Sequence, residues 1–201
     1  MRTLGLIGGM SWESTAVYYR LLNEGVKARL GGLHSAPLVI WSCDFAPVAA
    51  QQAAGEWSGL GHVLGEAGRK LVQAGAQGLL ICTNTMHLVY GAVEHASGVK
   101  VIHIADATGQ ALRPAGSRRP ILLGTRFTME RDFYRGRLKD RFGAEALVPD
   151  EAGRALVHRV IYEELCQGVV RDESRAAVLA VVEALRGQGA DGLILGCTEL
   201  T

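Results

Sequence analysis

Two short polar segments of this 201-residue chain carry side chains suited to proton transfer. The first is the run CTNTMH at residues 82–87, and the second is the run GCTE at residues 196–199. Each follows a short apolar stretch typical of a buried strand, where polar groups are costly unless they meet water or a ligand. The backbone N–H groups of such turns suit a carboxylate, and a thiol such as Cys197 suits acid–base work.

The same residues also have purely structural interpretations. Threonine and asparagine commonly cap helices, and a single cysteine is often a small core residue. For Cys197, the duplicated context described next favours a functional role, because functional groups concentrate on loops placed by a rigid sheet. For Asn84 and the threonines, both interpretations stay open.

The two segments belong to an internal repeat. Residues 75–85 read GAQGLLICTNT and residues 189–199 read GADGLILGCTE, so at a constant offset of 114 Thr83 matches Cys197. A second pair, LGLIGGMS near residue 8 and ILLGTRFT near residue 124, shares a strand–glycine–polar pattern before a helix. Two pairs in the same order predict two similar lobes related by a pseudo-twofold axis. Ligands of parallel α/β folds bind beyond the carboxyl ends of the strands, so we expect the active site between the lobes.

Apolar runs alternate with segments of helical periodicity, which predicts an α/β fold with parallel sheets flanked by helices. The segment RPAGSRRP at residues 113–120 interrupts the pattern. It predicts an N-terminal α/β lobe at 1–112 and a C-terminal α/β lobe at 113–201. Candidate strands are residues 4–8, 38–42, 78–82, 99–104, 121–124, 146–148 and 193–196. Two apolar helix faces are predicted, Leu60, Val63, Leu64, Ala67 and Leu71 before Gly75, and Val178, Val181, Val182 and Leu185 before Gly187.

The composition narrows the class of protein. Hydrophobic residues make up 48% and charged residues 20%, with a formal net charge of +1, which is an ordinary globular balance without a basic stripe for nucleic acid. The opening MRTLGLIGGMSW does not resemble a signal peptide, and the apolar runs are too short to span a membrane. Four cysteines without CxxC or zinc-like spacing favour free thiols in a reducing cytoplasm.

The residues present argue against two classes of cofactor-dependent enzyme and against a metal site. A pyridoxal-phosphate enzyme needs a Schiff-base lysine, and the lysines at 27, 70, 100 and 139 all lie outside the candidate turns. The glycine-rich turn at 5–10 lacks the GxGxxG spacing of a dinucleotide site. There is no HExxH motif or paired acidic cluster for a metal. We therefore expect no cofactor and a small-molecule substrate.

The motifs GLIGGMSWEST, CTNTMH, HIADAT and GCTEL resemble those of the pyridoxal-phosphate-independent aspartate/glutamate racemase family, with matching spacing from residue 4 to residue 200. The resemblance implies two facing lobes, each supplying one thiol to opposite sides of the substrate's α-carbon. One thiolate removes the α-proton and the other thiol returns a proton on the opposite face. This chain would then be a cofactor-independent racemase of aspartate or glutamate, with Cys197 as acid and base, and we expect a homodimer.

The first turn departs from the family pattern. The family usually has Cys-Asn-Thr, whereas here Thr83 precedes Asn84 and Thr85, and Cys82 lies one position earlier. Adjacent residues of a strand point to opposite faces, and the internal repeat also pairs Thr83 with Cys197. We therefore assign Thr83 as the second catalytic residue and Cys82 as structural. If the strand end is irregular, Cys82 would be the second thiol.

The resemblance also implies the residues that hold the substrate. Asn84, Thr85 and Thr198, with the backbone of Thr125, would bind the α-carboxylate and α-ammonium groups. Met10 would line the pocket, and Glu199 would orient the thiol or the ammonium group. Many relatives hold the side-chain carboxylate with a basic residue from each lobe. Here Gln52 and Arg126 are the replacements to test, while His87 and His103 are either structural or tune the thiol.

Two further expectations complete the sequence-based interpretation. The resemblance implies one more strand and helix after GCTEL, before which this chain ends. Two other functions stay open besides racemisation. They are a single-thiol decarboxylase or isomerase of a dicarboxylic acid, and a non-catalytic protein that binds acidic amino acids.

Overall fold

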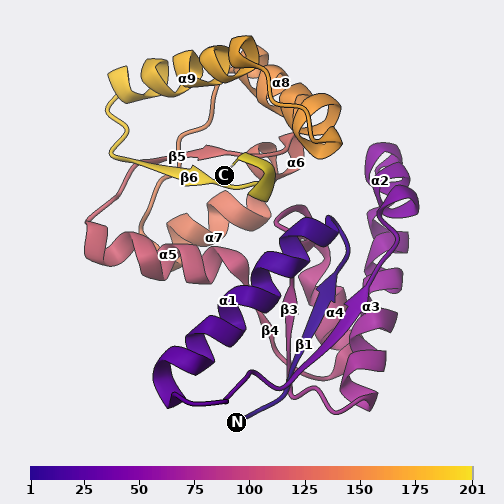
Figure 1. Cartoon of the computed structure of the whole chain (residues 1–201). Coiled ribbons are helices and arrows are strands. Elements are labelled where there is room, and N and C mark those ends of the chain that lie inside the picture. Colours follow the sequence, from indigo (N-terminus) through magenta and orange to yellow (C-terminus); the bar gives the residue numbers. More distant parts are fainter. Residues whose placement is uncertain (201) are drawn as a thin grey trace. The chain divides into compact units, whose positions relative to one another are not determined.

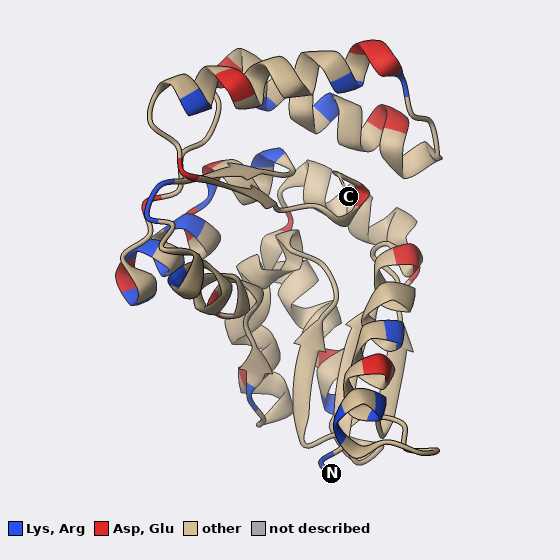
Figure 2. Cartoon of the chain, turned by 60° about the vertical axis from the view of Figure 1, so that its left-hand side comes forward, with Lys and Arg blue, Asp and Glu red and all other residues tan. Residues whose placement is uncertain are grey.

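The structure, a computed structural model, describes residues 1–200, and they form two compact α/β units (Figure 1). The first unit is Met1–His103 and the second begins at Ile104. None of the helices formed by the described residues has the length and apolar character needed to cross a membrane. Charged residues of both signs lie along helices and loops, and the described strands carry none (Figure 2).

The first unit is built on a parallel sheet in the order β2-β1-β3-β4. Helix α1 lies on one face of this sheet, and α3 and α4 lie on the other (Figure 1). Its elements are β1 (Leu4–Gly8), α1 (Trp12–Leu30), β2 (Leu38–Ser42), α2 (Phe45–Ala54), α3 (Trp57–Gln73), β3 (Gly78–Ile81), the 3-10 helix η1 (Thr85–Val89), α4 (Tyr90–Ser97) and β4 (Val101–Ile102).

The second unit has two parallel strands, β5 and β6, between two helical layers, with α5 and α7 on one side and α8 and α9 on the other (Figure 1). Separate apolar clusters fill the two sides, around Leu122 and Ile194 on one side and around Ile121 and Leu123 on the other. Its elements are α5 (Ile104–Ala115), β5 (Pro120–Leu123), α6 (Arg126–Glu130), α7 (Asp132–Phe142), α8 (Glu151–Arg159), a π-helix η2 (Val160–Glu164), η3 (Leu165–Gln167), α9 (Asp172–Gly187), β6 (Gly192–Leu195) and η4 (Thr198–Leu200).

The prediction of an α/β fold with parallel sheets flanked by helices is confirmed, with differences at several elements. The predicted strand 146–148 is reduced to a single bridge between Leu147 and Ile121. The predicted strand 99–104 shortens to Val101–Ile102, since α5 begins at Ile104. The units divide after His103, before the predicted boundary at 112, because α5 packs on the second unit. There Ala105 is fully buried with Leu122.

One predicted helix face is also shifted. In α3, Leu60, Leu64 and the residues one turn further on are buried as predicted, whereas Val63 is 42% exposed. The buried face of α3 includes its glycines Gly61, Gly65 and Gly68 instead. A Cβ on Gly65 would lie 2.9 Å from the Ala96 Cβ of α4, so glycine lets the two helices approach closely. This contact rotates α3 so that Val63 faces outward.

Candidate active site

The internal repeat of the sequence is reproduced in the backbone pairing. In the first unit Leu4 of β1 lies opposite Gly78 of β3, and in the second unit Pro120 of β5 lies opposite Gly192 of β6. The sequence repeat matches these same residues, because Gly78 and Gly192 are 114 positions apart. The two strand pairs therefore have the same register, and each ends in one of the two candidate turns.

The hydrogen bonds just after the strands extend this correspondence into the turns. The Cys82 N–H donates to the Ile7 carbonyl, and the Gly196 N–H donates to the Leu123 carbonyl. Cys82 thus occupies the position of Gly196, and the next residue, Thr83, occupies the position of Cys197. This agrees with the sequence alignment that separates Thr83 from Cys82.

Cys82 is part of the core of the first unit. Only 1% of its surface is exposed, and burial raises the pKa of its thiol to about 12. Its position after the strand matches Gly196 and not Cys197, and its side chain is enclosed in the apolar core. The geometry therefore favours the structural interpretation of Cys82.

Cys197 lies in a more polar setting at the start of the second turn. Its thiol donates a hydrogen bond to Glu199 Oε2 at 2.9 Å, and the Thr198 hydroxyl donates to the same oxygen at 2.9 Å. Burial raises the pKa of the Cys197 thiol, and the Glu199 carboxylate raises it further by charge repulsion and by accepting the S–H hydrogen bond. The structure thus brings Cys197, Thr198 and Glu199 together and favours the protonated thiol.

The imidazole of His87 contacts the backbone of the first turn. His87 is buried, and its Nδ1 lies 2.9 Å from the Thr83 carbonyl oxygen. The His87 ring packs 4.6 Å from the ring of His103, which contacts Tyr90 edge-on at 4.7 Å. The contact of His87 thus fixes the backbone of Thr83, and His103 packs against the ring of His87.

Asn84 and Thr85 follow Thr83 into η1. Thr85 is buried, while Asn84 is half-buried. The Asn84 Oδ1 atom is buried and accepts no hydrogen bond within the described residues. Buried amide oxygens are nearly always paired, so this unpaired acceptor is unusual.

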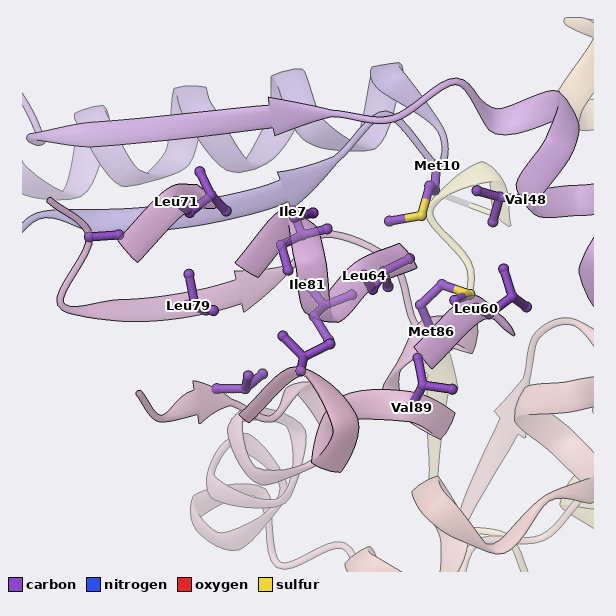
Figure 3. Packing of buried hydrophobic residues seen from close by; sticks show 14 residues of the cluster. Ile7, Met10, Val48, Leu60, Leu64, Leu71, Leu79, Ile81, Met86 and Val89 are labelled. Carbon is purple, nitrogen blue, oxygen red and sulfur yellow. The ribbon is translucent and has the colours of Figure 1, made fainter. Parts of the chain in front are cut away.

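Met10 and Gln52 are more deeply buried than residues that line a substrate pocket need to be. Met10 belongs to the apolar cluster at the carboxyl ends of β1 and β3, with Val48, Leu60 and Met86 (Figure 3). Gln52 is 3% exposed, and its amide Nε2 lies 3.0 Å from the Met86 sulfur. In this structure both side chains are part of the core of the first unit.

The glycine turns after β1 and β5 are shaped by hydroxyl groups. The Thr15 hydroxyl accepts from the Gly9 N–H at 2.9 Å, and Gly9 has φ of +85° with its Cα against the backbone of Cys43. In the second unit, Thr125 is the N-cap of α6 and its hydroxyl accepts from the Thr128 N–H. The structure thus gives Thr125 the capping role that the sequence left open beside substrate binding.

Arg126 is exposed, and its backbone N–H donates to His158 Nδ1 at 3.2 Å. Burial lowers the pKa of His158, and the Arg126 charge lowers it further. Tyr162, which no sequence signal indicated, is a charge neighbour of Cys197 and Glu199, and burial raises its pKa to about 12. Its position follows from the π-helix η2, which local sequence patterns do not reveal.

The chain is similar to a known protein family and to several solved structures. A profile of the Asp/Glu/hydantoin racemase family matches residues 7–201. The crystal structure of a candidate Asp/Glu racemase from Yersinia pestis is 49% identical, with a TM-score of 0.92 over 100% of this chain and 87% of that one. An aspartate racemase homologue from Pyrococcus horikoshii is 32% identical, with a TM-score of 0.79 over 100% and 87% of the two chains.

A third structure bears on the fold alone. The aspartate racemase of Picrophilus torridus is 20% identical and has a TM-score of 0.75 over 100% of this chain and 82% of that one. The match to the family profile covers nearly the whole chain and includes both candidate turns. The chain therefore belongs to the Asp/Glu/hydantoin racemase family, whose racemases are isomerases that act on small molecules.

Proposed function

We propose that this protein moves the α-proton of aspartate or glutamate and that Cys197 is its principal acid and base. The observation that carries the proposal is the hydrogen bond from the Cys197 thiol to the Glu199 carboxylate at the end of β6. A carboxylate that accepts S–H gives the thiol proton somewhere to go. No cofactor is needed in this scheme, because the side chains themselves exchange the proton.

The proton inventory of the proposed step is simple. The Cys197 proton passes to Glu199, and the resulting thiolate removes the α-proton, which leaves a carbanion and restores the thiol. Burial and Glu199 raise the pKa of Cys197, so its thiolate is a strong base once formed. A substrate ammonium group close to the sulfur would favour the thiolate by charge attraction.

Thr83 serves the opposite face of the α-carbon in this proposal. Its support is the matched register that puts Thr83 in the position of Cys197. A hydroxyl is a far weaker acid and base than a thiol, so Thr83 would position water or relay a proton. Proton transfer on the Thr83 face should therefore be slower than on the Cys197 face.

The substrate-binding residues remain those that the family motif implies. The unpaired Oδ1 of Asn84 would accept an N–H of the α-ammonium group. Thr85, Thr198 and the backbone of Thr125 would contact the α-carboxylate, and Arg126 would attract the side-chain carboxylate. Met10 and Gln52 would support this pocket from the core, where both are buried.

Exchange of the α-proton with solvent tests the proposal. Each enantiomer of aspartate and glutamate is incubated with the protein in deuterium oxide, and loss of the α-proton signal is followed by NMR. Asparagine and glutamine are the matched controls, since they differ only in the side-chain charge. We expect exchange of the acidic amino acids with both carboxylates retained. Binding without exchange, or loss of carbon dioxide, would instead support the two alternative functions.

We also propose a homodimer in a reducing cytoplasm. The support for a dimer is one face of α1, where Trp12, Tyr19 and Leu30 are in line with one another along the helix and more than half exposed. Apolar side chains gathered on one helix often mark a contact between subunits. Light scattering of the protein at micromolar concentration would give the mass directly, and a monomer would contradict this part of the proposal.

A further inference from the structure

The turn between β5 and α6 lies directly against the turn that carries Cys197. A Cβ on Gly124 would lie 3.0 Å from the carbonyl oxygen of Gly196, so only a residue without a side chain fits easily between the two backbones. Thr125 is the next residue of the chain, and the proposed function gives its backbone a contact with the α-carboxylate of the substrate. Whatever fixes this turn therefore bears on how the substrate is held beside Cys197.

Two hydrogen bonds fix the turn. Within α6, the Thr125 hydroxyl accepts from the Thr128 N–H. From a separate helix, α8, His158 contributes its ring, and the Arg126 N–H donates to His158 Nδ1 at 3.2 Å. The second bond ties the turn to an element far along the chain, so the place of the turn depends on the imidazole as well as on its own cap.

Two aromatic rings orient this imidazole. His158 is half-buried, and its ring centroid lies 4.7 Å from that of Tyr162 in η2. The ring of Phe127 in α6 meets it edge-on at 6.1 Å. Packing against two rings limits rotation of the imidazole, so its Nδ1 atom stays directed at the Arg126 N–H.

The bond to Arg126 requires a neutral imidazole with its proton on Nε2, because a protonated histidine donates at both nitrogens and accepts at neither. Burial lowers the pKa of His158, and the charge of Arg126 lowers it further. Glu130 of α6 and Glu163 of η2 act in the opposite direction, but Glu130 is paired with Arg154 at 3.0 Å. The balance is a lowered pKa, which keeps the acceptor available at neutral pH.

We propose that His158 is a positioning residue of the active site, whose neutral imidazole accepts the Arg126 N–H and so holds the Thr125 backbone in place for the substrate carboxylate. This inference rests on the proposed function, from which the substrate contact of Thr125 is taken. It makes substrate affinity dependent on the charge of His158. Affinity for aspartate should fall as the pH is lowered through the pKa of His158, because the imidazolium can no longer accept this bond.

Two variants separate the acceptor from the ring. His158→Phe keeps an aromatic ring without an acceptor, whereas His158→Asn keeps an acceptor near the place of Nδ1 and does not titrate. The rate of α-proton exchange is measured against aspartate concentration in deuterium oxide, and circular dichroism checks the fold. We expect His158→Phe to raise KM about three- to tenfold, the loss expected for one hydrogen bond, with little change in the maximal rate. His158→Asn should keep a KM close to that of the wild type at neutral pH.

The control is His95→Phe, because His95 is exposed on α4 in the other unit, and its KM should equal that of the wild type. An unchanged KM in a folded and active His158→Phe protein would overturn the inference and leave the proposed function intact. An equal rise of KM in His158→Phe and His158→Asn would also overturn it, because the ring and not the acceptor would then matter. Absence of exchange in the wild-type protein would instead contradict the proposed function itself.

The pH dependence and the tautomer give readouts that packing alone would not change. Between pH 7.5 and pH 5, KM for aspartate should rise in the wild type and stay nearly constant in His158→Asn. A wild-type KM that falls at low pH would overturn the inference, because the imidazolium would then attract the carboxylate by its charge. Long-range ¹⁵N NMR of the protein without substrate should show His158 as the Nε2–H tautomer at neutral pH. A proton on Nδ1 would contradict the bond on which the inference depends.

Discussion

The turn after β3 and the turn after β6 share a backbone but differ in their chemistry. Both strands pair with a preceding strand in the same register, and both continue with the same hydrogen bond beyond the strand end. At the matched position, one turn carries Thr83 with its carbonyl held by His87, and the other carries Cys197 with its thiol held by Glu199. The fold thus places a side chain at the same backbone position in both turns. The acidity of the group at that position differs because one residue is threonine and the other is cysteine.

The glycine next to Cys197 shows how far the two turns can differ. A Cβ on Gly196 would lie 2.7 Å from the Leu123 carbonyl oxygen, so only glycine fits there without a shift of the backbone. The first turn accommodates the Cys82 side chain at the same position, in the apolar core. The second turn is therefore closer to its neighbouring strand, and its geometry is the more sensitive of the two.

Removing the Cys197 thiol should have the largest effect on activity. Cys197→Ser should lower the rate of α-proton exchange by about 100- to 10,000-fold, the usual contribution of a general acid or base. A serine hydroxyl ionises far less readily than a thiol. Exchange is measured by NMR in deuterium oxide, and circular dichroism checks the fold. Cys43→Ser is the control and should keep its activity. Wild-type exchange in a folded Cys197→Ser protein would remove Cys197 from the mechanism.

Making the two turns alike should have the next largest effect. In the wild-type protein, one enantiomer of aspartate should exchange much faster than the other, because only one presents its α-proton to Cys197. Thr83→Cys should reduce the ratio of the two rates by about tenfold or more, since it restores a thiol on the slow face. Cys82→Ala should leave the ratio unchanged. The opposite result, with Cys82→Ala stopping exchange, would identify Cys82 as the second catalytic thiol.

The sequence was sufficient for the architecture because its strongest signals are local. The apolar runs gave β1 and β2 with their exact bounds, and the offset of 114 anticipated the matched registers. The boundary at 112 was displaced because α5 joins the second unit through long-range contacts. The Thr108 hydroxyl lies 2.8 Å from the Tyr134 hydroxyl, and neither residue signals this partner in its own segment.

The site was predictable only in part, for a related reason. Motif residues such as Cys197 and Asn84 stand out by their place after a buried strand. Their partners do not, because the contact of His87 with Thr83 depends on the 3-10 turn of η1. The contact of His158 with the Arg126 N–H lies beyond any local pattern, since it joins two separate helices. Packing decided that Gln52 would be buried against Met86.

The second turn should also be more sensitive than other glycine positions to a loss of stability. Gly196→Ala should lower the free energy of unfolding by about 1–3 kcal/mol, because the added methyl group meets the backbone of β5. Gly187→Ala is the control, since a Cβ there would meet no atom within 4 Å. This control should be neutral or slightly stabilising. Urea unfolding followed by circular dichroism measures both. Equal stability of the two variants would show that the second turn relaxes more easily than its geometry indicates.

The smallest expected effect concerns the charge beside Cys197. Glu199 raises the pKa of this thiol through its negative charge and its hydrogen bond, in addition to the effect of burial. Glu199→Gln removes the charge, so the pKa should fall toward its ordinary value while burial keeps it raised. More thiolate is then present at any pH below the pKa, and alkylation of Cys197 by iodoacetamide should be roughly threefold to tenfold faster. Mass spectrometry of each cysteine against pH measures this, with Cys82 as an internal control because it is buried in the other unit. A pH profile of Cys197 alkylation that stays in place or moves upward would mean that Glu199 does not act on the thiol. In that case the proposed transfer of the thiol proton to Glu199 would lose its basis.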